Sequence, residues 1–217
     1  MTTPTQDTHQ HEQADKLFEW LKRNRRVLIT TAISIVAIAA AVWFVFAARQ
    51  RREVVANREL ADARAVAASG NLALAAADLS QVVERFAGTT AGQEAAVLLA
   101  QIRLMEGQPG AAVVELERLL EAGPSDQFLA SAYGLLGAAH EQGGNLSAAA
   151  NAYRSAADAA WYDFLKAQHL LDAARVLSVA GDTAAAVSTL ERIISELAET
   201  DQTVEAQVRL YELRPNT

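Results

Sequence analysis

Histidine is the residue type in this sequence that most readily binds metals or transfers protons, and the chain has four of them. His9 and His11 form an HQH pair near the N-terminus, whereas His140 and His169 stand alone. In a flexible polar tail such a pair could contact a metal ion, but it more often binds nothing. The sequence also contains no cysteine, and therefore no thiolate ligand or thiol nucleophile. We predict no metal site, and a packing role for His140.

Motifs that hold phosphate or activate a nucleophile are also missing. The sequence has no GxxxxGK[ST] loop, no GxSxG elbow and no HExxH helix. Its GDTAAA and QGGNLS segments have the glycine of a phosphate loop without the lysine. Glu196 and Glu199 are spaced along one helical face, where carboxylates are most simply solvated. We predict no catalytic residue, no cofactor and no enzyme; an anchored enzyme of unrecognised activity is the alternative.

The charge is unevenly spread along the chain. The 217 residues carry a net charge of −7, and 51% of them are hydrophobic, mostly because of alanine, which favours helix. Residues 1–26 hold five basic and four acidic side chains, which leaves 14 basic and 22 acidic side chains in the remainder. Phosphate backbones need a basic face, so we predict that nucleic acid is not a partner.

Residues 27–48, VLITTAISIVAIAAAVWFVFAA, form an uncharged stretch of 22 residues. As a helix this stretch is roughly 33 Å long, enough to cross a hydrocarbon core of about 30 Å. Basic residues fence it on both sides, in KRNRR at 22–26 and RQRR at 49–52. The alternatives are a buried core helix, which rarely stays uncharged for so long, and a signal peptide, whose apolar region is usually about 7–15 residues. We predict a transmembrane helix in a lipid bilayer.

The orientation of this span follows only narrowly from charge. Five basic residues precede it closely and four follow it. Long following domains translocate largely regardless of charge, so the short N-terminal side should dominate. We predict a single-pass protein of the cell inner membrane with a cytoplasmic N-terminus and an extracytoplasmic C-terminal domain. Residues 1–13 are predicted to be a disordered tail, and residues 14–26 an amphipathic juxtamembrane segment.

A pattern with a period of 37 residues runs through the rest of the chain. A glycine is followed five residues later by an alanine, and four and three residues further on by two more positions on the same helical face. The glycine can end one helix with a positive φ, and Asn71, Asn145 or Asp182 can begin the next. A fixed period of this length indicates stacked repeats, so we predict an all-α solenoid of four helix hairpins. The predicted packing residues are Gly70, Ala75, Gly107, Ala112, Tyr133, Leu136, Gly137, Gly144, Ala149, Tyr153, Gly181, Ala186 and Leu190.

The third repeat resembles a tetratricopeptide repeat. Tyr133, Leu136 and Gly137 match the aromatic-x2-Leu-Gly pattern of the first helix, and Ala149 and Tyr153 match the Ala-x3-Phe pattern of the second. The usual period is about 34 residues. The longer period here therefore predicts first helices that are longer by almost a turn.

The predicted repeat domain covers residues 53–213, and a Thr90-x-x-Gln93 capping box is predicted to begin one of its helices. Its units are about 56–89, 93–126, 130–163 and 167–200, with a capping helix at 201–213. The first helices of such stacks line a concave side that generally binds partners. The predicted groove residues are Leu60, Arg64, Glu94, Val97, Gln101, Leu104, Met105, Glu141, Gln142, Gln168, Leu171 and Arg175. The aromatic WYDF loop, 161–164, is predicted to join the third unit to the fourth.

The whole arrangement resembles a narrower family, the bacterial single-span, tetratricopeptide-like ancillary subunits of the Sec translocon. The segment LFEWLKRN at 17–24 precedes the span, and Trp20, Asn24 and Trp43 match that family's positions. The resemblance implies a periplasmic domain that passes exported proteins from the translocon to chaperones. We therefore predict a membrane-anchored interaction scaffold in protein export, with the translocon, chaperones or unfolded clients as partners. The alternative is a membrane-tethered adaptor in envelope assembly or cell division.

Overall fold

The computed structural model describes residues 24–214, and over this range all regular elements are α-helices. The chain divides into one unit up to Arg51 and a second unit from Arg52 onward. The helices are α2 (Arg25–Ala68), α3 (Leu72–Phe86), α4 (Thr90–Met105), α5 (Pro109–Glu121), α6 (Asp126–Gln142), α7 (Leu146–Ala159), α8 (Asp163–Val179), α9 (Thr183–Glu196) and α10 (Gln202–Leu213). The all-α prediction is confirmed over these residues. The predictions for residues 1–13, for Trp20 and for most of 14–26 lie outside the described residues.

The helix α2 contains the predicted span, residues 27–48, and continues without a break to Ala68. Within the described part of the chain, one helical segment, Ile33–Ala68, is long and apolar enough to cross a membrane. Its most apolar window is 0% buried. By length and composition this segment is consistent with a membrane anchor or with a signal sequence.

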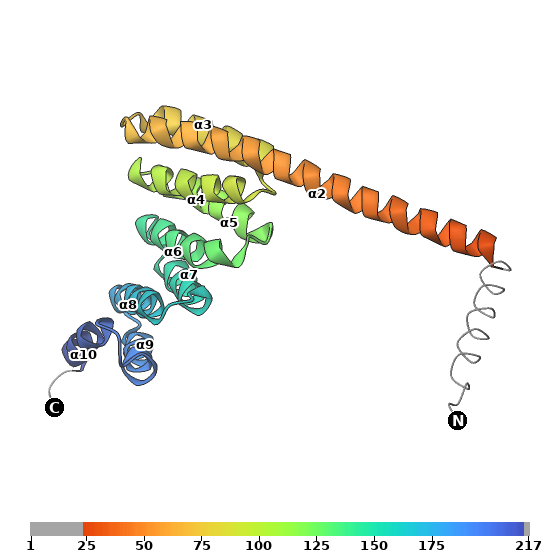
Figure 1. The fold of residues 1–217 in the computed structure, drawn as a ribbon. Coiled ribbons are helices and arrows are strands. Elements are labelled where there is room, and N and C mark those ends of the chain that lie inside the picture. Colours follow the sequence, from red (N-terminus) through yellow and green to blue (C-terminus); the bar gives the residue numbers. More distant parts are fainter. Residues whose placement is uncertain (1–23, 215–217) are drawn as a thin grey trace, which may run out of the picture. The chain divides into compact units, whose positions relative to one another are not determined.

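From Arg52 onward the helices form a stack of pairs, α2/α3, α4/α5, α6/α7 and α8/α9, followed by α10 (Figure 1). Each helix from α3 to α9 contacts the next one along the chain. First helices also contact the first helix of the next pair, because α4 meets α6 and α8 meets α10. The C-terminal part of α2 joins the first pair through an ion pair between Glu59 and Arg85 of α3, at 2.8 Å.

The turn inside each pair is built in the same way. The recurring glycines Gly70, Gly107, Gly144 and Gly181 all have positive φ, between +71° and +86°, a region that a side chain disfavours. After three of them, Asn71, Asn145 and Asp182 are the N-cap residues of the second helices, and each side chain accepts a hydrogen bond from the backbone N–H three residues on. This is the local chemistry that the sequence predicted.

The predicted capping box at the start of α4 is wrong by one residue. Thr89 is the N-cap, and its hydroxyl accepts a hydrogen bond from the Gly92 N–H at 3.0 Å. The next two N–H groups, of Thr90 and Ala91, donate to the carboxylate of Glu53 on α2, at 3.0 Å each. Gln93 does not close a box; its side-chain oxygen accepts from the backbone and hydroxyl of Ser125, ahead of α6. The starts of α4 and α6 are therefore each held by a side chain of the preceding first helix.

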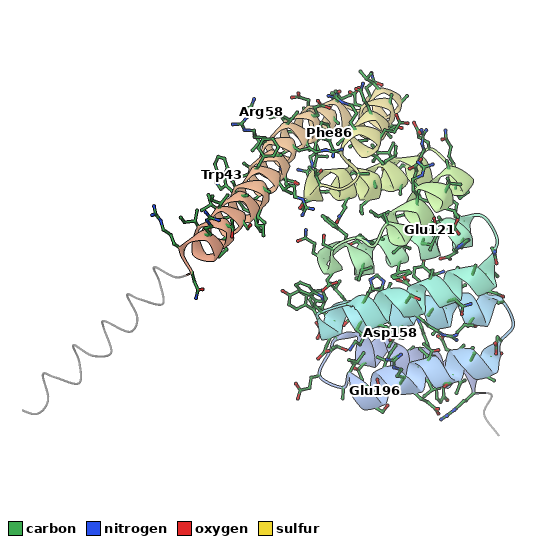
Figure 2. The ribbon with its side chains drawn as sticks, turned by 90° about the vertical axis from the view of Figure 1, so that its right-hand side faces the viewer. Trp43, Arg58, Phe86, Glu121, Asp158 and Glu196 are labelled. Atoms are coloured by element: carbon green, nitrogen blue, oxygen red, sulfur yellow. The ribbon has the colours of Figure 1, made fainter. Side chains whose placement is uncertain are left out.

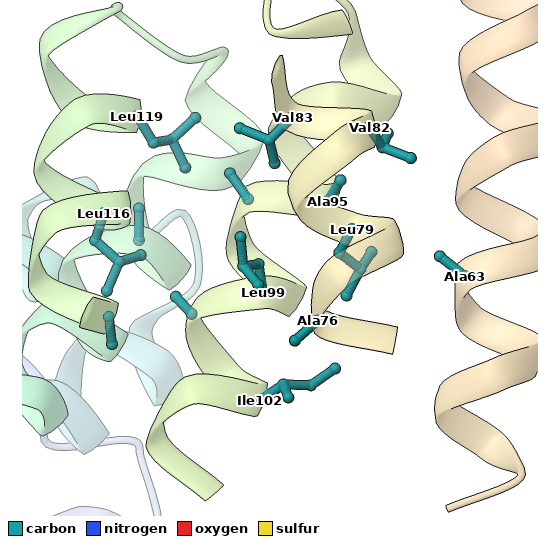
Figure 3. Close-up of a cluster of buried hydrophobic side chains, with 14 of the residues drawn as sticks. Ala63, Ala76, Leu79, Val82, Val83, Ala95, Leu99, Ile102, Leu116 and Leu119 are labelled. Atoms are coloured by element: carbon teal, nitrogen blue, oxygen red, sulfur yellow. The ribbon is translucent and has the colours of Figure 1, made fainter. Parts of the chain in front are cut away.

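The core lies between the helices and is built largely of alanine and leucine. Figure 3 shows part of it, where Leu79, Leu99 and Leu116 of three successive helices lie buried. The recurring alanines Ala75, Ala112, Ala149 and Ala186 are fully buried. A small side chain at these positions lets two helix axes approach closely, which is how the repeat interval translates into packing.

Gly137 shows the same requirement in its strictest form. A Cβ added there lies 2.7 Å from the Tyr153 ring, closer than any ordinary carbon–carbon contact. The aromatic ring of α7 therefore occupies the space that a side chain on α6 needs. The pairing explains why the sequence of the third unit combines Gly137 with Tyr153.

Candidate partner-binding surface

The predicted groove residues do not all lie at the surface. Leu60 and Leu171 are each only 1% exposed and belong to the hydrophobic core, so their assignment to a partner-binding surface is wrong. The two positions are three repeat periods apart in sequence, and each lies in a core cluster with a leucine from the second helix of its pair, Leu79 for Leu60 and Leu190 for Leu171. Gln101, Gln142 and Gln168 are exposed.

The charged groove residues pair with one another across neighbouring repeats. Arg64 of α2 forms an ion pair with Glu94 of α4. Arg175 of α8 binds both carboxylate oxygens of Glu141 on α6, one of them at 2.9 Å. A bidentate guanidinium–carboxylate pair fixes the orientation of both groups. These charged side chains therefore already bind one another and link neighbouring repeats. We call such ion pairs ties between repeats.

The Glu141–Arg175 tie is extended by two more residues. The Tyr153 hydroxyl donates to Glu141 at 3.0 Å, and Asp172 lies 3.5 Å from the Arg175 guanidinium. The hydrogen bond from Arg175 lowers the pKa of Glu141 below its usual value. Burial, together with the Glu141 charge, raises the pKa of Tyr153. Both groups stay in the protonation states that their hydrogen bond requires.

Sequence reasoning missed the partners in these ties, although the spacing carries a signal. Glu141 and Arg175 are 34 residues apart, and so are Asp158 and Arg192. Asp158, labelled in Figure 2, pairs with Arg192 across α7 and α9 at 3.3 Å. Arg192 also binds Glu196 at 3.0 Å, so this carboxylate has a structural partner. In these two cases an acidic residue is followed by arginine at nearly one repeat period and contacts it across equivalent helices, whereas Arg118, 34 residues after Glu84, pairs with Glu115 instead.

The remaining groove residues cluster on α4. We call Val97, Gln101, Leu104 and Met105 the α4 ridge. Val97 and Leu104 are half-buried and pack against the core, whereas Met105 is 65% exposed. Gln142 of α6 donates a hydrogen bond to the Leu104 carbonyl at 3.3 Å and so joins the neighbouring helix to this ridge. The ridge presents apolar side chains and one exposed amide on a firmly packed base.

The WYDF loop does not join the third unit to the fourth as predicted. Trp161, Tyr162 and Phe164 are all more than half exposed. The rings of Tyr162 and Phe164 stack on each other, with centroids 5.8 Å apart. The junction between the units is instead made by α7 packing on α8, through Ala157 and Leu170 among others.

His169 is a half-buried residue to which the sequence assigned no role. Its Nδ1 is buried and has no hydrogen-bond partner among the described residues. Burial lowers the pKa of His169, although the nearby Asp172 opposes that shift. The ring packs on Gly134 of α6, where an added Cβ would lie 2.8 Å from its Cε1 atom. His140, which was predicted to pack, is half-buried.

No cluster of three or more potential metal ligands exists among residues 24–214. His9 and His11 lie outside this range. Two small cavities lie in the C-terminal half of the stack. One, of about 260 Å³, is lined by Arg154, Leu170, Ala185, Ser188, Thr189 and Arg192. The other, of about 140 Å³, lies between α8, α9 and α10. Neither brings together a nucleophile and a base.

No family model matches the sequence, and no curated protein matches it. Solved structures do match the fold. A tetratricopeptide repeat protein from Parabacteroides merdae has a TM-score of 0.59 at 11% identity, over 73% of this chain and 60% of that chain. MamA from Desulfovibrio magneticus RS-1 has a TM-score of 0.55 at 19% identity, over 67% and 77%. The kinesin light chain TPR-like repeats of Podosopora anserina reach 0.57 at 19% identity, over 72% and 84%.

These similarities establish the fold. The chain has a tetratricopeptide-like helical repeat fold, as the resemblance of its third unit predicted.

Proposed function

We propose that this protein is a protein-interaction scaffold that binds partners on the α4 ridge and is held at a membrane by α2. The observation that carries the proposal is the composition of the ridge. Its charged neighbours are engaged in ties between repeats, while Met105 and Gln101 face solvent. Unbranched methionine adapts to differently shaped apolar partners, and a packed base keeps the cost of ordering low.

Attachment to a membrane compensates for the weak affinity expected of so small a surface. A ridge of four residues offers little apolar area, so its affinity for a protein segment is expected to be weak. Attachment to a membrane raises the effective concentration of such a site near any membrane complex. The apolar part of α2 is solvent-exposed throughout its most apolar window, as a lipid-facing helix would be. A tether and a weak surface together favour an adaptor.

We further propose that the membrane complex is the Sec translocon and that the repeat domain is extracytoplasmic, where it hands exported proteins to chaperones. Support comes from the resemblance of Trp20, Asn24 and Trp43, and of the repeats that follow, to the single-span ancillary subunits of that machinery. An adaptor in envelope assembly or cell division would have the same topology. Crosslinking from the predicted span distinguishes that adaptor from a translocon subunit.

The first experiment places a photo-crosslinking amino acid at Met105 of the full-length, membrane-inserted protein. Val114 on the second helix α5 is the matched control, because it is also an exposed apolar residue, at 53% against 65% for Met105. We expect crosslinks to protein partners from position 105 and few from position 114. Equal crosslinking from both positions would refute the ridge as the binding surface.

The second experiment tests the membrane complex and the topology. Protease added to intact spheroplasts should digest the repeat domain if it is extracytoplasmic, and protection would refute that orientation. A crosslinker at Trp43, on the predicted span, should then recover translocon subunits. Recovery of division or envelope-assembly proteins without any translocon component would remove the export proposal and leave the scaffold proposal standing.

A further inference from the structure

The helix α10 repeats the pattern of a first helix. Its residues Val204, Val208 and Tyr211 lie 37 residues after Ala167, Leu171 and Ala174 of α8. In α8 these positions share a core cluster with Leu190 and Ile193 of the second helix α9 and are 0%, 1% and 2% exposed. In α10 they are 66%, 54% and 67% exposed. We call Val204, Val208 and Tyr211 the α10 face.

The other side of α10 is occupied as the repeat register requires. Ala206 is fully buried, and Leu210 and Leu213 pack against the cores of α8 and α9. These positions lie 37 residues after His169, Ala173 and Val176, which face the preceding pair in the same way. The α10 helix thus docks onto the stack like a first helix, while the face that would receive a second helix is uncovered in the described part of the chain.

We propose that the α10 face binds an α-helix of a partner protein in the place that a second helix takes in the four preceding pairs. This surface is separate from the α4 ridge and needs neither the membrane anchor nor the export role. The argument for its occupant is continuity: the register position of Tyr211 is buried in all four preceding pairs, and that of Val208 is buried in the first and the fourth, at Leu60 and Leu171. Tyrosine and valine at i, i+4 and i+7 spacing are the anchors that amphipathic helices use in such grooves.

Tyr211 sets which helix fits. At the equivalent position the four pairs have Ala63, Ala100, Gly137 and Ala174, all small. The second helix opposes these with a bulky residue, as the contact between Gly137 and the Tyr153 ring shows. In α10 the bulky residue is on the first helix, so the partner helix must be small opposite Tyr211. The size pattern of the interface is reversed.

A second copy of the same α10 fits this requirement poorly. Beside the α10 face stands the exposed carboxylate of Glu212, whereas Glu205 is already paired with Arg209. No small side chain lies between the three residues of that face. Two antiparallel copies would place bulky side chains against one another. The complementary partner is a helix with a small residue at its centre and lysine or arginine beside it.

The test uses the full-length protein in detergent micelles and two fluorescent peptides that copy residues 182–196. One peptide has the α9 sequence and the other carries L190A, because Leu190 is the bulky residue that opposes Ala174 in the fourth pair. Binding is followed by fluorescence anisotropy. We expect the L190A peptide to bind about tenfold more tightly, since forcing a leucine against Tyr211 overpacks the interface.

The variants make the result specific. Tyr211→Ala should reverse the preference, so that the unmodified peptide binds more tightly. Val208→Asp should abolish binding of both peptides, whereas Val114→Asp, at a residue exposed to 53% against 54% for Val208, should leave it unchanged. Circular dichroism checks that each variant keeps its helix content.

Three results would overturn the proposal. They are binding that survives Val208→Asp, a peptide preference that Tyr211→Ala does not alter, and failure of both peptides to bind up to millimolar concentration. Concentration-dependent dimerisation that Val208→Asp removes would overturn it in favour of a second copy as the occupant.

Discussion

Replacing Gly137 with alanine tests the packing that defines the third repeat. Gly137 lies within α6, where alanine would otherwise raise helix stability by up to about 1 kcal/mol. Here the new Cβ falls 2.7, 2.8 and 2.9 Å from three atoms of the Tyr153 ring. The ring cannot move away freely, because its hydroxyl is bonded to Glu141 at 3.0 Å and the side chain is buried.

We expect Gly137→Ala to lower the free energy of unfolding by about 1–3 kcal/mol, the usual cost of overpacking a core. The matched control is Gly110→Ala in α5, where no atom lies within 4 Å of the added Cβ. That change should leave stability unchanged or raise it slightly. The measurement is urea unfolding of the full-length protein in detergent, followed by circular dichroism.

A second substitution isolates the cause. In the Gly137→Ala background, Tyr153→Leu shortens the side chain that meets the new methyl group and should cost less than the same change in the unmodified protein. The two substitutions should therefore be coupled by at least about 0.5 kcal/mol. If Gly137→Ala is as stable as the parent, or if the two effects simply add, the close contact between α6 and α7 is not what places a glycine there.

Two further predictions concern pH and capping. Burial lowers the pKa of His169, so the unfolded chain binds a proton more readily than the folded chain. The contribution of His169 to the free energy of unfolding is therefore full above about pH 6.5 and is lost as the pH falls toward the folded-state pKa. Between pH 7.5 and 5 the parent should lose more stability in urea titrations than His169→Gln, and parallel pH profiles would contradict this. Gln108 is an N-cap without a side-chain cap bond, whereas Asn71 and Asn145 have one at the same repeat position. Gln108→Asn should raise the unfolding midpoint by the equivalent of about 0.5 kcal/mol, and an unchanged or lower midpoint would show that its existing bond to Arg103 is worth as much.

Local signals in the sequence were enough to predict the stack of hairpins. A glycine with positive φ, an Asn or Asp cap and a small residue at the crossing are each required by backbone geometry or by close packing, and they recur at one period. Such requirements act over a few residues, so they can be recognised without knowing the tertiary structure. The fold of the repeat region was predictable for this reason.

The predicted groove was less accurate, because a surface depends on long-range partners. Leu60 and Leu171 were assigned to the partner-binding surface, whereas both are buried in the core. Glu141 and Arg175 were placed on the correct helices, yet each was taken separately for a partner contact. Only the three-dimensional structure shows that they bind each other, because the sequence does not tell which acidic side chain of the neighbouring repeat pairs with the arginine.

The ties between repeats help to decide where this protein can bind others. Ion pairs that are about a third exposed, such as Arg175 with Glu141, contribute little to stability in water. These ion pairs do, however, satisfy the charged side chains of the predicted groove. A partner that competed for those side chains would have to break an existing hydrogen-bonded pair. A partner gains more binding free energy by covering the apolar side chains that the stack leaves exposed. These are Met105 on α4 and Val208 and Tyr211 on α10. Recognition by this scaffold should therefore be apolar at its centre, with low sensitivity to salt.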